Sequence, residues 1–415
     1  MGGSTFLIGL VPGYDTIGLF APLTVLLLRF VQGLALGGEY GGAATYVAEH
    51  SPKNERGFYT SFIQTTATLG LFVSLGIILS VRQSMDADAF NSYGWRIPFL
   101  ASAVLVAISI YIRLRMDESP LFAKIKADGN LSKNPIKESF GKKENLKLVL
   151  IALFGATAGQ GVVWYTGQFY ALSFIQKTCN IEFVQSNYII ATALLIASPL
   201  FIFFGWWSDR VGRKYIIMTG MILGVVFYRP IYQKMYSLSD IAKKTEMENM
   251  QSIHRHRTTK PTGDTVVTNS LNRVYSDRTV LVETKKTTTS KDNLITVENK
   301  RETLLSGDTY WWMVALITIQ VIFVTMVYGP IAAFLVELFP TKIRYTSMSL
   351  PYHIGNGIFG GLTPLIATSL YEFSKTESNP SGDPVAGLWY PIIVAGICFV
   401  IGMFFLSNKK SERHE

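Results

Sequence analysis

The chain has 415 residues, of which 49% are hydrophobic and 16% are charged, and its formal net charge is +9. Soluble globular chains carry about 25% charged residues, so this composition excludes an ordinary soluble domain. The positive charge does not indicate nucleic-acid binding, because no basic patch outside the apolar runs carries interleaved aromatic residues.

Apolar runs separated by short polar loops recur along the chain. A membrane-spanning helix needs about 20 mostly apolar residues. Ten segments meet this requirement, and Pro12 and the pair Arg229-Pro230 interrupt the first and the seventh. The segments are 4–20, 22–48, 59–82, 96–113, 147–170, 184–206, 215–232, 311–336, 346–370 and 386–406. We therefore predict an all-α membrane protein with about ten transmembrane helices. If loop 49–57 is cytoplasmic, most Lys and Arg residues of the short loops lie on the cytoplasmic side, as membrane proteins require.

The segment 22–48 places two ionisable residues, Arg29 and Glu39, inside one span. A charged side chain at the bilayer centre costs about 2.5–3.5 kcal/mol, so a functional role is the default interpretation. The planar fork of Arg29 suits a substrate carboxylate. A desolvated carboxylate takes up protons more readily near neutral pH, so Glu39 is a candidate carrier of a coupled proton. The alternative is that both residues form buried ion pairs that hold the fold together.

Two loops repeat the pattern E-x-x-P-x-x-x-R. The first runs from Glu49 to Arg56 and the second from Glu337 to Arg344, and both lie on the predicted cytoplasmic side. Proline ends a helix in each loop, and the Glu and Arg bracket the turn and can pair across it. Such repetition is expected of a transporter built from two related halves. We predict that these four residues belong to a cytoplasmic gate.

The span 147–170 carries polar and aromatic residues at Gln160, Trp164, Tyr165 and Gln168. This density suits a helix that lines a polar cavity, and Tyr165 and Gln168 are candidate substrate ligands. The alternative is that the aromatic residues anchor the helix at the membrane interface.

A basic loop, Gly205-Trp206-Trp207-Ser208-Asp209-Arg210-Val211-Gly212-Arg213-Lys214, joins two predicted spans. Its glycines allow a tight turn, and Asp209 can pair with Arg210 or Arg213 or lie at a helix N-terminus. The pattern G-x-x-x-D-R-x-G-R-K resembles the cytoplasmic loop motif of the major facilitator superfamily of transporters. We therefore add Asp209, Arg210, Gly212 and Arg213 to the predicted gate.

The block 233–308 is rich in Lys, Thr, Ser, Asp and Glu, and no membrane span fits within it. A short amphipathic helix is expected from Ser239 or Asp240 towards residue 253. The runs Thr279–Glu283 and Leu294–Glu298 are rich in β-branched residues and can pair as a hairpin. The topology places the block outside the cytoplasm, where we expect a small, loosely packed insertion rather than a binding domain.

The span 346–370 contains Tyr352, His353 and Asn356 at membrane depth. Tyr352 and Asn356 are candidate substrate ligands. A histidine can take up a proton near neutral pH, so His353 is a second candidate for proton coupling. The alternative is a core histidine with satisfied hydrogen bonds.

Several longer stretches extend the resemblance. The R-x-x-Q-G pattern that contains Gln32 is similar to a second superfamily motif, and Gln32 joins the candidate substrate ligands. The run from Arg29 to Gly57, Gly94-Trp95-Arg96-Ile97-Pro98-Phe99, Glu118-Ser119-Pro120, and the run from Tyr328-Gly329-Pro330 to Gly361 look like the metabolite:proton symporter family. That family includes proline/betaine, shikimate and dicarboxylate transporters, and the likeness covers nearly all of 4–228 and 311–406. It implies a transporter of the bacterial inner membrane that imports a small organic acid or zwitterion by proton symport with alternating access.

The complete superfamily architecture has twelve helices, so the resemblance implies that this chain lacks the first two. We expect an incomplete N-terminal bundle at 1–116 and a cytoplasmic middle loop at 117–146, with an amphipathic helix at 119–127. A C-terminal bundle at 147–409 would contain the insertion at 233–308. Two other interpretations stay open: a truncated, non-transporting relic or receptor-like protein, and an uncoupled facilitator or sugar carrier of the same fold.

The sequence does not indicate an enzyme. No nucleophile–base set, metal-ligand spacing or phosphate-cradling loop lies outside the predicted spans. Cys179 and Cys398 form no disulfide framework. We expect a monomer in a lipid bilayer whose partners are its substrate and protons, with no metal, cofactor or nucleic acid.

Overall fold

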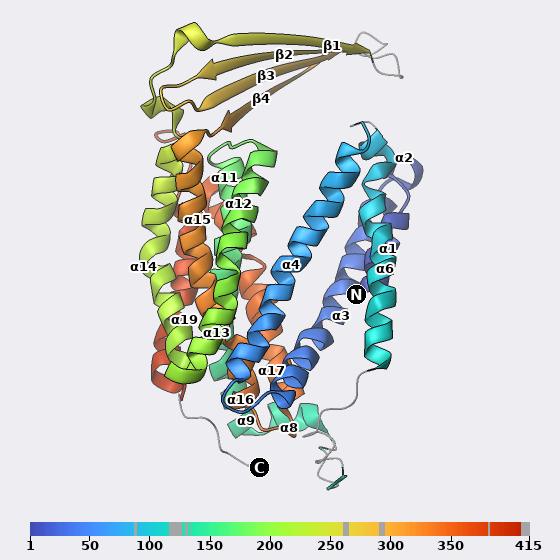
Figure 1. The fold of residues 1–415 in the computed structure, drawn as a ribbon, viewed down its shortest axis with the longest axis vertical. Coiled ribbons are helices and arrows are strands. Elements are labelled where there is room, and N and C mark those ends of the chain that lie inside the picture. The colour runs from blue at the N-terminus through green and yellow to red at the C-terminus, as the bar shows by residue number, and fades with distance from the viewer. Residues whose placement is uncertain are drawn as a thin grey trace.

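The computed structural model describes residues 1–86, 89–115, 127–128, 132, 134–259, 265–289, 295–380 and 382–407. Long helices run side by side, and a sheet lies across one end of them (Figure 1). Within these residues, eight helices are long and apolar enough to cross a membrane: Phe20–His50, Arg56–Gln83, Phe90–Leu114, Lys143–Lys177, Phe183–Val211, Arg213–Ser239, Gly307–Leu338 and Ala386–Phe405. This confirms the prediction of a helical membrane protein with one polar insertion.

The helices before residue 116 form one group, which we call the N-terminal group. Its elements are α1 (Gly2–Leu10), α2 (Tyr14–Ile17), α3 (Phe20–His50), α4 (Arg56–Gln83), η1 (Phe90–Gly94) and α6 (Arg96–Leu114). The expected span 4–20 is interrupted after Leu10. Val11 precedes Pro12 and adopts an extended conformation with φ −63° and ψ 127°, because proline disfavours the helical conformation in the residue before it.

The remaining helices form the C-terminal group, in which α15 is buried along most of its length. The first half of this group comprises α8 (Pro135–Gly141), α9 (Lys143–Ala152), η2 (Leu153–Thr157), α10 (Ala158–Tyr165), η3 (Thr166–Tyr170), α11 (Ala171–Lys177), α12 (Phe183–Ala197), α13 (Pro199–Val211) and α14 (Arg213–Ser239). The second half comprises α15 (Gly307–Tyr328), α16 (Ile331–Leu338), α17 (Arg344–His353), η6 (Ile354–Gly360), α18 (Thr363–Phe373), η7 (Ala386–Leu388) and α19 (Trp389–Phe405). The expected span 346–370 is divided. α17 passes directly into the π-helical η6, and a turn at Gly361 and Leu362 then separates η6 from α18, which has Pro364 in its first turn. Residues 119–126 of the helix expected in the middle loop lie outside the described residues.

The insertion is an antiparallel sheet in the order β1-β2-β3-β4, at the opposite end of the molecule from α8, α9 and α16 (Figure 1). Its strands are β1 (Ser252–Thr259), β2 (Thr265–Val274), β3 (Val280–Thr289) and β4 (Ile295–Leu304). The small insertion that the sequence predicted is therefore a regular sheet, and few of its strand residues are buried. Threonine and valine favour strands, and together they let each strand extend for eight to ten residues.

Local expectations for the insertion also need correction. α14 continues to Ser239, beyond the expected boundary at residue 233. The helix expected after Asp240 is replaced by two short 3₁₀ turns, η4 (Ile241–Lys243) and η5 (Glu248–Met250), and then by β1. The expected hairpin joins the right strands in a different register, since Glu283 pairs with Arg301 and Ile295 with Thr289. The polar run Thr284–Thr289 is long enough to carry β3 past the expected turn.

Two sets of contacts fasten the sheet to the C-terminal group. The backbone of Thr303 exchanges hydrogen bonds with Asn180 and Glu182, at 2.7 and 3.0 Å. The Asp277 carboxylate lies 2.7 Å from the Lys244 ammonium and accepts a 3.1 Å hydrogen bond from Thr309 in α15. Burial acts to raise the pKa of Asp277, but hydrogen bonds from Lys244 and Thr279 lower it to about 2. The carboxylate is therefore ionised near neutral pH, and its contribution to stability is lost progressively as the pH falls from about 3.8 through about 2.

Candidate functional site

The turn between α13 and α14 positions the motif residues. Gly212 adopts a φ of 111°, which residues with a Cβ resist, so the chain reverses at once and Arg213 begins α14. The Arg213 guanidinium lies 2.6 Å from the Asp209 carboxylate and 2.9 Å from that of Glu337. The three side chains are 8%, 5% and 15% exposed, so each charge needs the others for compensation.

The Asp209 carboxylate also joins the two groups of helices. Its two oxygens accept hydrogen bonds from the backbone amides of Gly57 and Phe58, at 2.9 and 2.8 Å. These amides belong to the first turn of α4, where helix N–H groups lack helical partners and the helix dipole favours an anion. A residue of the C-terminal group therefore caps a helix of the N-terminal group, and the cap exists only while the groups touch here.

A buried ion pair crosses the same boundary. The Arg344 guanidinium of α17 lies 2.6 Å from the Glu49 carboxylate of α3, and these side chains are 9% and 2% exposed. Arg344 also donates a 3.2 Å hydrogen bond to the Phe339 carbonyl. The Glu of the first loop repeat thus pairs with the Arg of the second.

Two glycines let α4 and α13 approach closely beside these charges. A Cβ added at Gly205 would lie 2.5 Å from the Gly57 carbonyl oxygen, and a Cβ added at Gly57 would meet the Gly205 carbonyl oxygen. The buried residues of α4 all lie in its first half, and the helix diverges from α13 towards the sheet (Figure 1). We call the residues that make these contacts the latch, and their end of the molecule the latch end: Glu49, Gly57, Asp209, Gly205, Arg213, Glu337 and Arg344.

Two residues expected in the gate make other contacts. The Arg210 guanidinium stacks on the Trp206 ring, 4.0 Å from its centroid. Arg56 donates a 3.1 Å hydrogen bond to the Ala48 carbonyl within its own group of helices. Both lie near the latch without joining its network.

An aromatic cluster joins the two groups of helices further from the latch end. Tyr40 of α3 stacks on Tyr352 of α17, with ring centroids 3.6 Å apart and an interplanar angle of 3°. Gln64 of α4 donates a 2.8 Å hydrogen bond to the Tyr40 hydroxyl, and the Tyr328 and Tyr352 hydroxyls lie 2.8 Å apart. Trp164 stacks on Tyr328 at 5.4 Å. We call these residues the aromatic cluster; of them, only Tyr352 was predicted as a site residue, although Tyr40 stands in the same glycine-rich stretch as Glu39.

An amide pair lies beside the aromatic cluster. Gln160 and Asn356 exchange two hydrogen bonds of 3.1 Å, and Asn356 also donates to the Tyr352 carbonyl at 3.1 Å. The structure therefore brings two predicted ligands, Tyr352 and Asn356, together. Tyr165 packs edge-on against Trp164 at 4.8 Å, on the margin of the cluster. Gln168 lies further along, half-buried in η3.

Arg29 and Glu39 make contacts within the N-terminal group. Arg29 donates a 3.2 Å hydrogen bond to Gln32, which in turn donates a 2.6 Å hydrogen bond to Thr5 of α1. The Glu39 carboxylate lies 4.0 Å from the Arg113 guanidinium of α6, and both side chains are exposed. These contacts place neither Arg29 nor Glu39 in the aromatic cluster.

His353 lies next to the aromatic cluster. Its Nδ1 is 2.6 Å from the Ser349 carbonyl oxygen, and its ring meets Tyr352 edge-on at 5.3 Å. A carbonyl oxygen only accepts, so Nδ1 carries a hydrogen.

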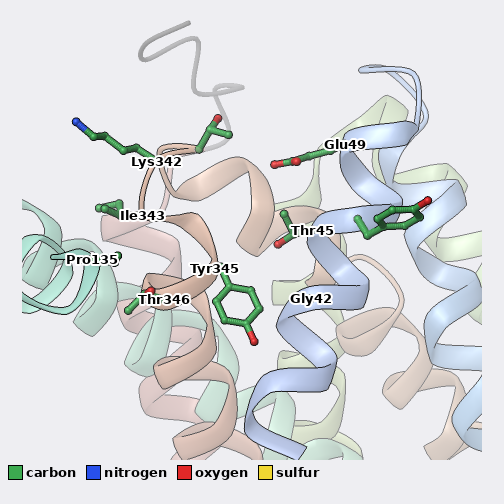
Figure 2. Close-up of a pocket in the computed structure, with 10 residues that line it drawn as sticks. Gly42, Thr45, Glu49, Pro135, Lys342, Ile343, Tyr345 and Thr346 are labelled. Carbon is green, nitrogen blue, oxygen red and sulfur yellow. The ribbon is translucent and has the colours of Figure 1, made fainter. Parts of the chain in front are cut away.

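A pocket of about 450 Å³ lies at the latch end between α3 and the loop that leads into α17 (Figure 2). Figure 2 shows the Glu49 side chain reaching from α3 towards the facing loop, whereas the Lys342 side chain points away. The pocket lies at the boundary between the two groups of helices rather than at the aromatic cluster. Within the described part of the chain, no group of three or more His, Cys, Asp or Glu residues could hold a metal ion.

Known proteins resemble this chain along most of its length. Residues 1–232 match the family model of the Major Facilitator Superfamily. A protein of Haemophilus influenzae named putative metabolite transport protein is 28% identical over 99% of this chain and 76% of its own. The alpha-ketoglutarate permease of Escherichia coli is 25% identical over 99% of this chain and 75% of its own.

A solved structure shares the fold. The proton:xylose symporter XylE, bound to 6-bromo-6-deoxy-D-glucose, superposes with a TM-score of 0.61 over 99% of this chain and 79% of its own. The two sequences are 14% identical, so this likeness concerns the fold alone.

Proposed function

Because this chain belongs to the Major Facilitator Superfamily, we propose that it imports a small organic acid or zwitterionic metabolite together with a proton. Membership makes it a multi-pass membrane protein and a secondary transporter. The observation that carries the proposal is the latch, which joins two groups of helices at one end through groups that are charged and almost fully buried. We place it in a bacterial inner membrane, because the relatives described above are bacterial proteins. We place the latch end in the cytoplasm on the distribution of Lys and Arg.

The latch is suited to alternating access. In the state described here, Asp209 caps α4 and Glu49 pairs with Arg344, so the groups are held together at the latch end. Opening breaks these contacts and exposes the same charges to water, which replaces the lost partners. The free energies of the two states can therefore stay within a few kcal/mol, as a transport cycle requires.

The aromatic cluster and the amide pair support binding of a small polar metabolite. They offer hydroxyl and amide groups that donate and accept hydrogen bonds, together with ring surfaces that suit an apolar carbon skeleton. Tyr40 and Gln64 belong to the N-terminal group, whereas Tyr352 and Asn356 belong to the C-terminal group. A ligand that binds here contacts both groups, so its binding can be coupled to their relative motion.

Uptake by the purified chain in proteoliposomes tests the proposal. The panel is betaine, proline, shikimate, alpha-ketoglutarate and xylose, each with and without an inward proton gradient. We expect accumulation of a carboxylate-bearing compound only while the gradient lasts. Uptake that does not depend on the gradient would indicate an uncoupled facilitator. Uptake of xylose alone would indicate a sugar carrier, and the absence of uptake would indicate a non-transporting protein.

We propose that Arg29 and Gln32 bind the substrate carboxylate during the transport cycle. Arg29→Ala should raise the KM for that substrate about tenfold or more, because a charge-assisted hydrogen bond contributes about 1.5–3 kcal/mol. Arg29→Lys should recover only part of this loss, because an ammonium lacks the planar fork. An unchanged KM would leave Arg29 as a structural partner of Gln32 and Thr5.

We propose His353 as the first candidate for the coupled proton and Glu39 as the second. His353 lies against Tyr352 of the aromatic cluster, whereas Glu39 faces Arg113. His353→Gln should abolish accumulation driven by the gradient while preserving exchange of labelled for unlabelled substrate, because exchange needs no net proton movement. Glu39→Gln should preserve both activities. If instead Glu39→Gln abolishes accumulation and His353→Gln preserves it, the coupled proton would be assigned to Glu39.

A further inference from the structure

The two faces of the inserted sheet differ in charge. Paired residues of neighbouring strands point to the same face of the sheet, so the register shows on which of the two faces each side chain lies. On one face, Lys286 lies 3.9 Å from Glu298 and Lys300 lies 2.7 Å from Glu302. These lysines are therefore neutralised by neighbours on the same face.

The opposite face carries three basic residues, Arg255, Arg257 and Lys285, that are exposed and form no ion pair with any residue that the structure describes. The register aligns Arg255 and Lys285 in one row with the amides Asn269 and Asn299. We call this surface the basic face. Nearer the sheet's base, the other two cations of this face are paired. Glu283 lies 3.3 Å from Arg273 and 2.8 Å from Arg301, and Glu246 lies 3.6 Å from Arg273.

The three unpaired cations lie in the half of the sheet that projects furthest. The sheet is fastened at Thr303 and Asp277, and its strands run from the C-terminal group across the end of the helices (Figure 1). Arg257 and Lys285 occupy the second halves of β1 and β3, and Arg255 lies in the same row as Lys285, away from these attachments. The position of this half, across the end at which α4 diverges from α13, suits a solute that approaches the aromatic cluster from the sheet end.

We propose that the basic face concentrates small carboxylate anions at the sheet end of the transporter, and thereby deepens the proposed function, on which this inference rests. Three unpaired cations raise the local concentration of an anion within a Debye length, about 8 Å at physiological ionic strength. The gain appears as a lower KM for an anionic substrate. The maximal rate is unaffected because the residues lie outside the helices that move the substrate.

Thiol reactivity in the full-length protein tests the charge of this face independently of transport. Thr287→Cys places a thiol on the basic face, in the row of Arg257, whereas Thr284→Cys places one on the opposite face. The native Cys179 and Cys398 are buried and give little background. We compare the rates at which an anionic thiol reagent and its cationic analogue react at low salt. The ratio of the anionic to the cationic rate should be about tenfold higher at position 287 than at position 284. Arg255→Gln with Arg257→Gln and Lys285→Gln should remove this preference, and equal reactivity at the two positions would overturn the proposal.

Uptake measured on the same triple variant tests the role of the face. With alpha-ketoglutarate, which is a dianion, the KM should rise about threefold at low salt, converge with wild type at high salt and leave the maximal rate unchanged. Betaine, which has no net charge, should show no change in KM. Lys286→Gln with Lys300→Gln on the opposite face is the matched control, and it should not raise the KM for alpha-ketoglutarate. A preference at position 287 that disappears in vesicles of anionic lipid would show that headgroups occupy the face, and would overturn substrate capture even if transport is intact.

Discussion

Replacing Glu49 by Gln is expected to slow transport about tenfold or more, because the change leaves Arg344 buried without its partner. Removing one member of a buried ion pair costs about 3–5 kcal/mol. This cost falls on the state that is closed at the latch end, since water reaches Arg344 when the end is open. A difference of this size changes the ratio of the two states by a factor of roughly 10² to 10³, so the closed state becomes a minor species.

Spin labels across the boundary measure this shift directly. His50 of α3 and Lys342 beside α17 are exposed, so His50→Cys with Lys342→Cys can carry the labels. Glu49→Gln should move their distance distribution to longer values, and exchanging the charges with Glu49→Arg and Arg344→Glu should restore part of the short distance. Glu372→Gln is the matched control, because its partner Lys375 lies 2.8 Å away and both side chains are largely solvated. Unchanged distances and rate in Glu49→Gln would remove this pair from the gate.

The loop repeats show how much of the site the sequence could predict. Glu49, Glu337 and Arg344 were recognised from a pattern within each loop, and all three lie in the latch. The pattern favoured pairing of Glu and Arg across each turn, whereas Glu49 pairs with Arg344 and Glu337 with Arg213. Spacing along the chain reports only local neighbours, and these partners are set by how two distant groups of helices pack.

Apart from Tyr352, the aromatic cluster escaped prediction for a related reason. Tyr40 follows Glu39 directly, and successive residues of a helix point in directions about 100° apart. The charged residue drew the functional interpretation, yet it faces α6, while the tyrosine faces α17. In the insertion, the composition located the β-branched runs. The pairing of the strands depends on the positions of the turns, however, and β3 extends past the turn that we expected.

Gly57→Ala should also impair closure at the latch end, by a steric rather than an electrostatic route. The new Cβ would meet the Gly205 carbonyl oxygen and lie 2.6 Å from the Arg213 guanidinium and 2.8 Å from the Ser208 hydroxyl. A backbone oxygen cannot move aside unless α13 moves with it, so α4 and α13 must separate. The separation lengthens the hydrogen bonds from Gly57 and Phe58 to Asp209, and two latch contacts weaken together.

A matched glycine on the same helix makes this prediction specific. Nothing lies within 4 Å of a Cβ added at Gly76, so Gly76→Ala should leave transport unchanged and can strengthen α4, because alanine favours helix by about 1 kcal/mol over glycine. Gly57→Ala should reduce the transport rate about tenfold or more and lengthen the distance between labels at positions 50 and 342, with little change in thermal stability, because only one of two folded states is affected. A transport rate for Gly57→Ala equal to that of Gly76→Ala would mean that α4 and α13 need not approach this closely during transport, and the latch would then be a static contact of the fold.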